Sequence, residues 1–431
     1  AVFVDGEQLG TAIGTKAAAA ALALAASAAG CSAPKAITLG KGTQTALTID
    51  GYEVPAGVFI YNEIYAYNNA AYTLYSKNGE YPELEDVKNA KIDELDAADW
   101  IQDNAVDFCR DFVATELEFD KVGEQLTQEQ LDEIDERTAM NAGNEMFTKN
   151  GVGTESMKAM VANSYKQETL FKHYYGIDAE KGCSEDDLKE YFKDKTARIK
   201  YFSVSLNNSE GTEYDADTKQ EIVKLVDGYV KEINSAKTNE LKLAKLTECE
   251  DKYNEWVEKK TAEEAAKAAE EAGETVTTTT QVTTTTASGE TTTTTTDPYA
   301  DEVTLVKYTT TTADKDAEPV ETTTAAAGTP DYNKIQQDYS DFVFGKMENY
   351  KAEKYQYDES TIYVIIKADI SERMTEEDFW SEENVDNVLY DRYYQDFTDM
   401  MKDKAEAMGV IKNNSAFRKF APFKLDLSDM K

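Results

Sequence analysis

The chain has 431 residues, a formal net charge of −38 and one histidine, and 41% of its residues are hydrophobic. Such an acidic surface repels phosphate backbones and anionic headgroups, which argues against nucleic-acid binding and against electrostatic binding to a membrane surface. The hydrophobic content and the 26 tyrosines suffice for real cores, and the length allows two or three domains.

The single histidine, His173, limits the chemistry that the chain can perform. Ser-His-Asp and Cys-His catalysis would both need this residue, and a zinc site built from several histidines is impossible. His173 comes at the end of a predicted helix, shortly before Gly176. We interpret it as a cation that stabilises a helix C-terminus.

The first 30 residues have the pattern of a secretory signal peptide. After Lys16 comes an alanine-rich apolar run of about 14 residues, too short to cross a bilayer. Ala28-Ala29-Gly30-Cys31 resembles the lipobox of bacterial lipoproteins, which implies that Cys31 carries the lipid and begins the mature chain. Ala28 departs from that pattern, which usually has leucine there, and the stretch before Lys16 is acidic. The alternative interpretation of residues 1–30 is an alanine-rich core helix.

Residues 31–44 are expected to form a linker, and a helical region is expected to follow. Asp50-Gly51 predicts a turn after a short strand, and Pro55 suits the first turn of the next helix. Tyrosines recur along that helix at helical spacing, which is usual for a core-facing stripe. Because tyrosine combines apolar area with a hydrogen-bonding tip, the stripe could instead line a groove for unfolded peptide. Its members are Tyr61, Tyr65, Tyr72 and Tyr75.

Further helices are predicted around 100–112, from 127, over 157–170 and over 184–195. The cysteines other than Cys31 are too scattered to form a metal pattern, and their odd number is a poor disulfide framework. Cys109 lies among apolar helix residues, where we expect it to be a small buried hydrophobe.

Two segments have the sequence pattern of strands, and we expect them to pair with each other in one small sheet. Residues 198–206 alternate in a period of two, and residues 361–370 form a short β-branched run. Between them we expect helices over 215–273 with a break at 234–239, a small strand at 303–308 and a short helix from 339. Threonine supplies 15 of the 22 residues at 275–296, so 274–330 is expected to be an extended insert. It could carry O-linked sugars or be a bare loop.

A final helix is predicted over 382–408 and ends at Gly409. We expect it to return to the early helices. The alternating apolar residues of 420–427 could add an edge strand.

The arrangement resembles extracytoplasmic foldase lipoproteins and periplasmic chaperones, in which a parvulin-type peptidyl-prolyl isomerase module is inserted into a helical chaperone domain. In this resemblance 198–204 matches the first parvulin strand, with Tyr201 where the family has a histidine. Residues 363–367 match the last strand, with Val364 where the family has its second histidine. Phe344 stands where the family has a phenylalanine in the preceding helix. The glycine-rich segment of the family is missing, so the resemblance implies a degenerate, inactive isomerase module.

The predicted fold is therefore α+β and predominantly α. A helical chaperone-like domain would comprise 45–195 and the returning segment 372–431, and the degenerate parvulin-like module would comprise 196–371. The resemblance further implies a lipid-anchored protein on the outer face of the bacterial cell membrane.

The resulting functional hypothesis is a chaperone that binds unfolded or nascent secreted polypeptides. Its clients would bury apolar side chains against aromatic grooves, while the acidic surface keeps complexes soluble. No cofactor, metal or nucleic acid is expected. The candidate peptide-binding residues are Tyr61, Tyr65, Tyr72, Tyr75, Tyr201 and Phe344.

Three alternatives stay open. The module could be a working isomerase with a non-histidine pocket, for which Tyr201, Phe344 and Cys249 are the candidates. The protein could instead be a surface-interaction or solute-binding lipoprotein with no role in folding. The third alternative is an unrelated hydrolase, for which the abundance of acids makes carboxylate spacing uninformative.

Overall fold

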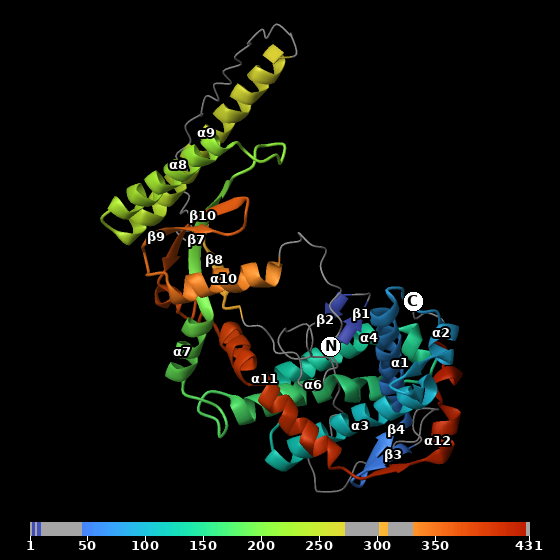
Figure 1. The fold of residues 1–431 in the computed structure, drawn as a ribbon. Helices are drawn as coiled ribbons and strands as arrows, with labels where there is room; N and C mark the ends of the chain where they lie inside the picture. The colour runs from blue at the N-terminus through green and yellow to red at the C-terminus, as the bar shows by residue number, and fades with distance from the viewer. Residues whose placement is uncertain (1, 5–6, 10–44, 272–300, 309–330, 428–431) are drawn as a thin grey trace, which may run out of the picture. The chain divides into compact units, whose positions relative to one another are not determined.

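The computed structural model describes residues 2–4, 7–9, 45–271, 301–308 and 331–427 (Figure 1). The chain divides into two compact units. Unit 1 consists of Ala1–Leu188 and Glu382–Lys431, and unit 2 of Lys189–Ser381. Helices dominate and the sheets are small, so the prediction of a predominantly α-helical α+β fold is confirmed. The expected signal peptide, Cys31 and the linker at 31–44 lie outside the described residues, apart from two short strands near the start.

Unit 1 is mainly helical, with small antiparallel sheets. Its helices are α1 (Ala56–Asn78), α2 (Leu84–Asn89), α3 (Ala97–Val122), α4 (Gln128–Asn141), α5 (Glu145–Thr148), α6 (Thr154–Tyr175), α11 (Glu382–Glu406) and α12 (Asn414–Lys419), with the 3₁₀ helix η2 (Pro422–Lys424). Its strands are β1 (Val2–Val4), β2 (Glu7–Leu9), β3 (Thr45–Ile49), β4 (Tyr52–Pro55), β5 (Lys91–Ile92), β6 (Leu95–Asp96) and β11 (Val410–Lys412).

The hairpin of β3 and β4 turns at Asp50-Gly51, as predicted. Both residues have positive φ, 46° and 86°, which suits the two central positions of a tight hairpin turn. The Asp50 carboxylate accepts a hydrogen bond of 2.9 Å from the Gly409 amide. Strand β11 follows Gly409 directly and pairs with β3, so a late segment of unit 1 joins an early one in the sheet β11-β3-β4.

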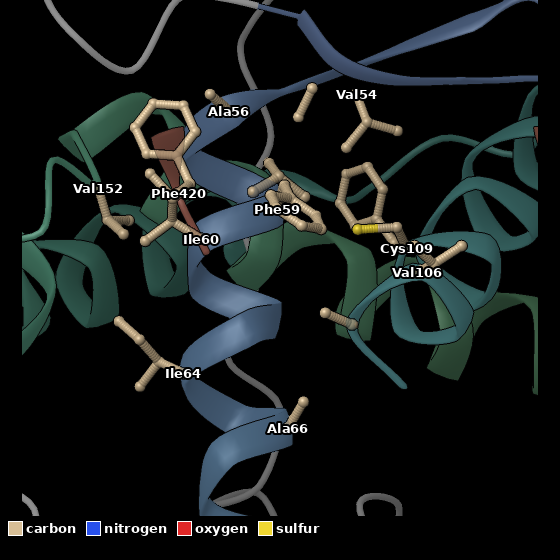
Figure 2. Close-up of a cluster of buried hydrophobic side chains, with 14 of the residues drawn as sticks. Val54, Ala56, Phe59, Ile60, Ile64, Ala66, Val106, Cys109, Val152 and Phe420 are labelled. Carbon is tan, nitrogen blue, oxygen red and sulfur yellow. The ribbon is translucent and has the colours of Figure 1, made fainter. Parts of the chain in front are cut away.

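The core of unit 1 forms around α1, which is buried over most of its first four turns. Figure 2 shows Phe59 and Ile60 on this helix, with Val106 and Cys109 of α3 on one side and Val152 and Phe420 on the other. The Cys109 side chain is fully buried, as expected, and burial raises the pKa of its thiol to about 12. Small residues at 66, 70 and 71 let α1 pack closely against its neighbours.

The tail does not form the expected edge strand. Residues 422–424 form η2 instead, and Phe420 and Leu427 pack into the core of unit 1. The backbone amide of Asp426 donates a hydrogen bond to the side chain of Asn150. This amide is therefore not available to pair with a neighbouring strand. The tail forms a short helix instead of a strand because its apolar side chains reach the core more directly from this conformation than from a sheet edge.

Glu118 ties three helices of unit 1 together. It lies on α3 and accepts hydrogen bonds from Tyr174 of α6 and from Lys121, and it forms an ion pair of 3.1 Å with Lys404 of α11. Burial by itself would raise the pKa of this carboxyl, but the three donors outweigh it and hold the pKa at about 2. Helix α11 therefore returns to the early helices, as predicted, and a buried charge fixes it there.

Replacing Glu118 by glutamine is expected to lower the free energy of unfolding at pH 7 by about 3 kcal/mol, the equivalent of its pKa depression. The unfolded chain takes up the proton first as the pH falls, so wild-type protein loses this contribution between about pH 4.5 and about pH 2. The gap between the two proteins should narrow over that range. Urea denaturation followed by the fluorescence of Trp100, in unit 1, measures it. Glu136→Gln, at an exposed position of α4, is the control and should change nothing.

Unit 2 contains one sheet with helices on both faces. Its elements are most of α7 (Glu185–Lys195), then β7 (Thr196–Ser205), α8 (Ala216–Ser235), α9 (Asn239–Glu271), β8 (Val303–Val306), α10 (Tyr332–Gly345), β9 (Ala352–Gln356), β10 (Thr361–Ala368) and the 3₁₀ helix η1 (Ile370–Arg373). The predicted break between α8 and α9 and the predicted small strand at β8 are both confirmed.

The two predicted strands, β7 and β10, pair antiparallel at the centre of this sheet, in the order β8-β7-β10-β9. The register sets Tyr201 opposite Ile365 and Phe202 opposite Val364. Since side chains alternate across a strand, these two pairs lie on opposite faces. The face of Phe202 and Val364 packs against α8 and α9, and the face of Tyr201 packs against α10 (Figure 1).

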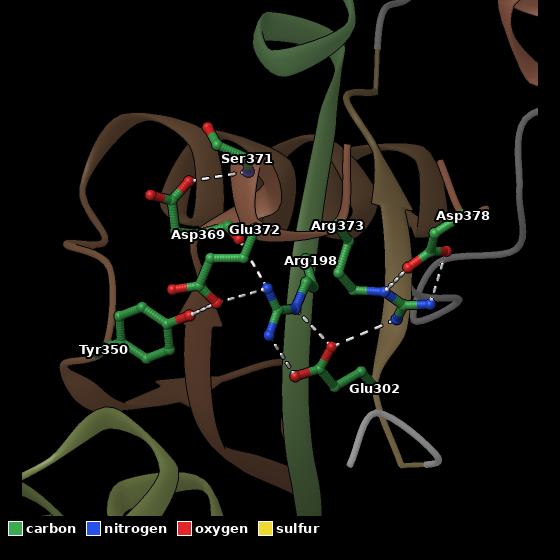
Figure 3. A network of polar contacts seen from close by, with 8 residues as sticks. All are labelled: Arg198, Glu302, Tyr350, Asp369, Ser371, Glu372, Arg373 and Asp378. Atoms are coloured by element: carbon green, nitrogen blue, oxygen red, sulfur yellow. Dashed lines mark hydrogen bonds and ion pairs between the residues drawn. The ribbon is translucent and has the colours of Figure 1, made fainter. Parts of the chain in front are cut away.

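A buried ion network joins three elements of unit 2 (Figure 3). Arg198 of β7 forms two bonds with Glu302, of 2.5 and 3.0 Å, and a third of 3.0 Å with Glu372 of η1. The side chains of Arg198 and Glu302 are each only 2% exposed. Arg373 lies 3.5 Å from Glu302 and binds Asp378 with two further bonds. The network holds the segment before β8 and the segment after β10 against β7.

Replacing Arg198 by methionine is expected to destabilise unit 2 by about 3 to 5 kcal/mol, because it leaves Glu302 buried and short of a partner. The double variant with Glu302→Leu should regain most of that loss. Lys354→Met, which removes a half-exposed pair with Asp227, should cost no more than about 1 kcal/mol. Urea denaturation read from Trp256 and Trp380, both in unit 2, compares the three.

Candidate functional site

A layer of aromatic rings covers the face of the unit 2 sheet that packs against α10. Tyr201 of β7 and Tyr363 of β10 lie side by side, with ring centroids 4.7 Å apart. Tyr357, which follows β9, stacks on Tyr363 at 4.6 Å. Tyr339 of α10 meets the rings of Tyr357 and Tyr363 edge to face, at 5.5 and 5.6 Å. The rings thus come from three strands or strand ends and one helix.

A cavity of about 360 Å³ opens beside these rings. We call it the tyrosine cavity. It is lined by Ile199, Tyr201, Val303, Thr304, Leu305, Val306, Tyr308, Gln336, Tyr339, Ser340, Tyr357 and Tyr363. None of these twelve side chains is charged, in a chain whose net charge is −38. An apolar wall with a few polar groups is the usual make-up of a site for an uncharged ligand.

The Tyr339 hydroxyl is an unsatisfied polar group within this layer. The side chain is 8% exposed, and its hydroxyl finds no hydrogen-bond partner among the described residues. Burial, together with the neighbouring hydroxyls of Tyr201, Tyr363, Tyr357 and Tyr355, raises its pKa, so it is a neutral phenol in the folded protein. A buried polar group left unpaired costs about 1 to 3 kcal/mol, which makes this position expensive for stability alone.

Only one of the two positions matched to parvulin histidines reaches the cavity. Tyr201 lines it, whereas Val364 is fully buried on the other face, against α8 and α9. The residues suggested for a non-histidine isomerase pocket do not come together either. Cys249 lies on α9, in the cluster on the face of Val364, and burial raises the pKa of its thiol to about 11. Phe344 lies on the α10 side, outside the cavity lining, with Lys307 and Lys367 each 5.6 Å from its ring.

The tyrosine stripe of α1, in unit 1, divides into two parts. Tyr61 and Tyr65 pack against Phe147, and their hydroxyls lie 3.2 Å apart. Burial is the main cause of the raised pKa of both. Tyr72 and Tyr75 are 45% and 41% exposed, with ring centroids 6.0 Å apart. The first pair therefore belongs to the core, and only the second pair offers an aromatic surface.

Sequence reasoning missed the part that Tyr308, Tyr339 and Tyr357 play in the site. Tyr355 and Tyr357 alternate with polar residues, a period-two signal that could have indicated a strand with one aromatic face. Tyr339 was recognised only as an apolar helix position. Its place in the cavity depends on how α10 packs on the sheet, which no local pattern reports.

Other candidates are accounted for by local structure. His173 lies near the end of α6, and its Nδ1 is 2.9 Å from the Glu124 carboxylate.

Within the described ranges, no group of His, Cys, Asp and Glu side chains is arranged to hold a metal ion. The helices of the described part include none that is both long and apolar enough to span a membrane.

No family model, curated protein or solved structure matches this chain.

The Tyr339→Phe variant is expected to gain stability, by about 1 kcal/mol, because it removes a hydroxyl that is buried without a partner. Tyr308→Phe is the matched control, since the Tyr308 hydroxyl lines the same cavity but already donates to Asn333 at 3.2 Å. It should lose about 0.5 kcal/mol. Urea denaturation of the full chain measures both, and a loss of stability in Tyr339→Phe would contradict the assignment of an unpaired hydroxyl.

Proposed function

We propose that this protein is a lipid-anchored extracytoplasmic chaperone that binds unfolded secreted polypeptides, and that its isomerase-like module has no isomerase activity. The observation that carries the proposal is the tyrosine cavity. It presents neutral aromatic and apolar area in a strongly acidic protein, and it lies on the sheet that β7 and β10 build together. These are the two strands on which the resemblance to foldase lipoproteins rests.

The chemistry of the cavity supports holding a client rather than isomerising it. Isomerisation faces a barrier of about 18 to 20 kcal/mol, so an enzyme must bind the twisted imide better than the planar one. Such preferential binding requires hydrogen-bonding groups held in fixed positions around the imide bond that rotates. Here the cavity contributes large rings and one unpaired hydroxyl, while Val364 and Cys249 are buried on the far face. Rings of this kind bind many side chains and favour none strongly.

Surface charge supports the same proposal. Apolar side chains of a client would be covered in the cavity while the acidic surface of the chaperone keeps the complex soluble. The exposed pair Tyr72 and Tyr75 offers a second aromatic surface, in unit 1. The lipid anchor at Cys31 and the extracytoplasmic location remain part of the proposal through the lipobox pattern.

Aggregation of a reduced, unfolded secreted protein tests the proposal. The full chain at an equimolar ratio should suppress light scattering, and Tyr201→Ala should weaken the suppression because it removes a ring from the lining of the cavity. Tyr332→Ala is the matched control, since Tyr332 is 66% exposed at the start of α10 and lies outside the cavity. In a proline-limited refolding assay the slow phase should keep its rate. Absence of any suppression would overturn the chaperone proposal, and a faster slow phase would restore the isomerase alternative.

A second candidate, solute capture, is favoured by a cavity of about 610 Å³ in unit 1. Helices α3 and α11 form most of it, and Gln167 of α6 adds to the lining. Its charged groups are Asp107, Arg110, Asp111, Lys402 and Glu406. This function predicts saturable binding of one solute and indifference to unfolded proteins. A thermal-shift screen of cationic and zwitterionic solutes separates it from the chaperone proposal.

A further inference from the structure

We propose that the Tyr339 hydroxyl is a recognition group of the tyrosine cavity, and that it donates a hydrogen bond to a backbone carbonyl of an extended, uncharged polypeptide segment. The inference rests on the proposed function and adds to it the group that is recognised and the residue that recognises it.

The first argument is the state of the hydroxyl. More than nine tenths of buried polar groups in proteins have a partner, and an exception indicates a role or a ligand. Tyr339 is 8% exposed, its oxygen is unpaired among the described residues, and the side chain lines a cavity. Its neighbour Ser340 is by contrast satisfied, because it accepts a hydrogen bond of 2.9 Å from the Tyr308 amide. Among the described residues that line the cavity, Tyr339 therefore carries the buried donor that lacks a partner.

The second argument is that the donor can be uncovered. The rings packed against Tyr339 are those of Tyr355, at 5.3 Å, and of Tyr357 and Tyr363, which meet it edge to face at 5.5 and 5.6 Å. Tyr357 is only half-buried and lies at the end of the β9–β10 hairpin, where its amide bonds to Thr361 at 2.9 Å. Rotation about its side-chain bonds moves the ring without breaking the sheet. A client side chain can then take the place of this ring, and the client backbone comes within reach of the hydroxyl.

The third argument concerns charge. A carboxylate acceptor would lose its hydration in a cavity with no charged lining residue, which is costly without a cation to pair with. Lys307, which follows β8, already forms an ion pair of 3.1 Å with Asp194. A neutral acceptor suits the cavity, and the backbone carbonyl is the neutral acceptor that every polypeptide carries. Uncharged segments should thus be preferred whatever their exact sequence.

The test uses the full chain and a dansyl-labelled ten-residue peptide made of alanine, leucine, glutamine and tyrosine. Tyr339→Phe should weaken binding about 3- to 10-fold, the usual effect of one neutral hydrogen bond. Tyr332→Phe, at an exposed position of α10 outside the cavity lining, should bind like wild type. A series of peptides with a single thioamide, a weaker acceptor, should contain one member that binds wild type less tightly and binds Tyr339→Phe unchanged. A central aspartate should weaken binding to both proteins.

The thioamide comparison separates recognition from a structural effect, because altered packing would not depend on one carbonyl of the peptide. The melting temperature of Tyr339→Phe should not fall below that of wild type. Equal binding by wild type and Tyr339→Phe, with aggregation still suppressed by both, would overturn this inference and leave the chaperone function standing. Failure of the wild-type chain in both assays would overturn the proposed function, and the inference with it.

Discussion

The pairing of β7 with β10 is the interaction on which unit 2 depends. These strands lie more than 150 residues apart in the chain, and eight residue pairs join them, from Thr361 with Ser205 to Ala368 with Arg198. Closing so long a loop costs conformational entropy that the hydrogen bonds alone do not offset. Burial on both faces supplies the rest, since Ile199 and Ile365 face α10 while Val204 and Ile366 face α8 and α9. The shorter strands β8 and β9 then occupy the two edges.

The register of this pairing also determines what the site can be. A shift of one residue would exchange the two faces of β10 and bring Val364, instead of Ile365, opposite Tyr201. In the observed register the strand tyrosines Tyr201 and Tyr363 lie on the α10 face with Ile199 and Ile365, whereas Phe202, Val364 and Ile366 lie on the other face. The cavity is therefore aromatic and uncharged as a direct result of strand alignment. A side chain on the far face cannot act in it, whatever its chemistry.

Buried charged residues join helices and strands within each unit of this acidic protein. Glu118 and Arg198 are both deeply buried and both satisfied, each by partners from more than one element. Each thus fixes the relative position of the helices or strands that it contacts, which apolar packing alone would leave less well defined. Glu63 is the contrast: it is fully buried on α1, both of its oxygens lack a partner in the described part of the chain, and burial raises its pKa. Burial thus disfavours the charged form of Glu63, whereas the partners of Glu118 favour its charged form.

Local pattern was enough to predict most elements of this protein. The β-branched run of β10, the alternation in β7 and the Asp50-Gly51 turn depend on the conformational preferences of neighbouring residues, and each could be predicted. The last long helix was predicted to run to 408, whereas α11 ends at Glu406. The return of α11 to the early helices was expected from the family resemblance and not from a local pattern. What only the tertiary structure decided was which side chains share a space. The sequence could not show that Val364 and Tyr201 lie on opposite faces of the sheet, or that Tyr339 and Tyr201 line the same cavity. The face that a strand residue occupies depends on a register that is set by distant packing. The division of the α1 tyrosines into core and surface pairs has the same cause, since Phe147 covers only the first pair.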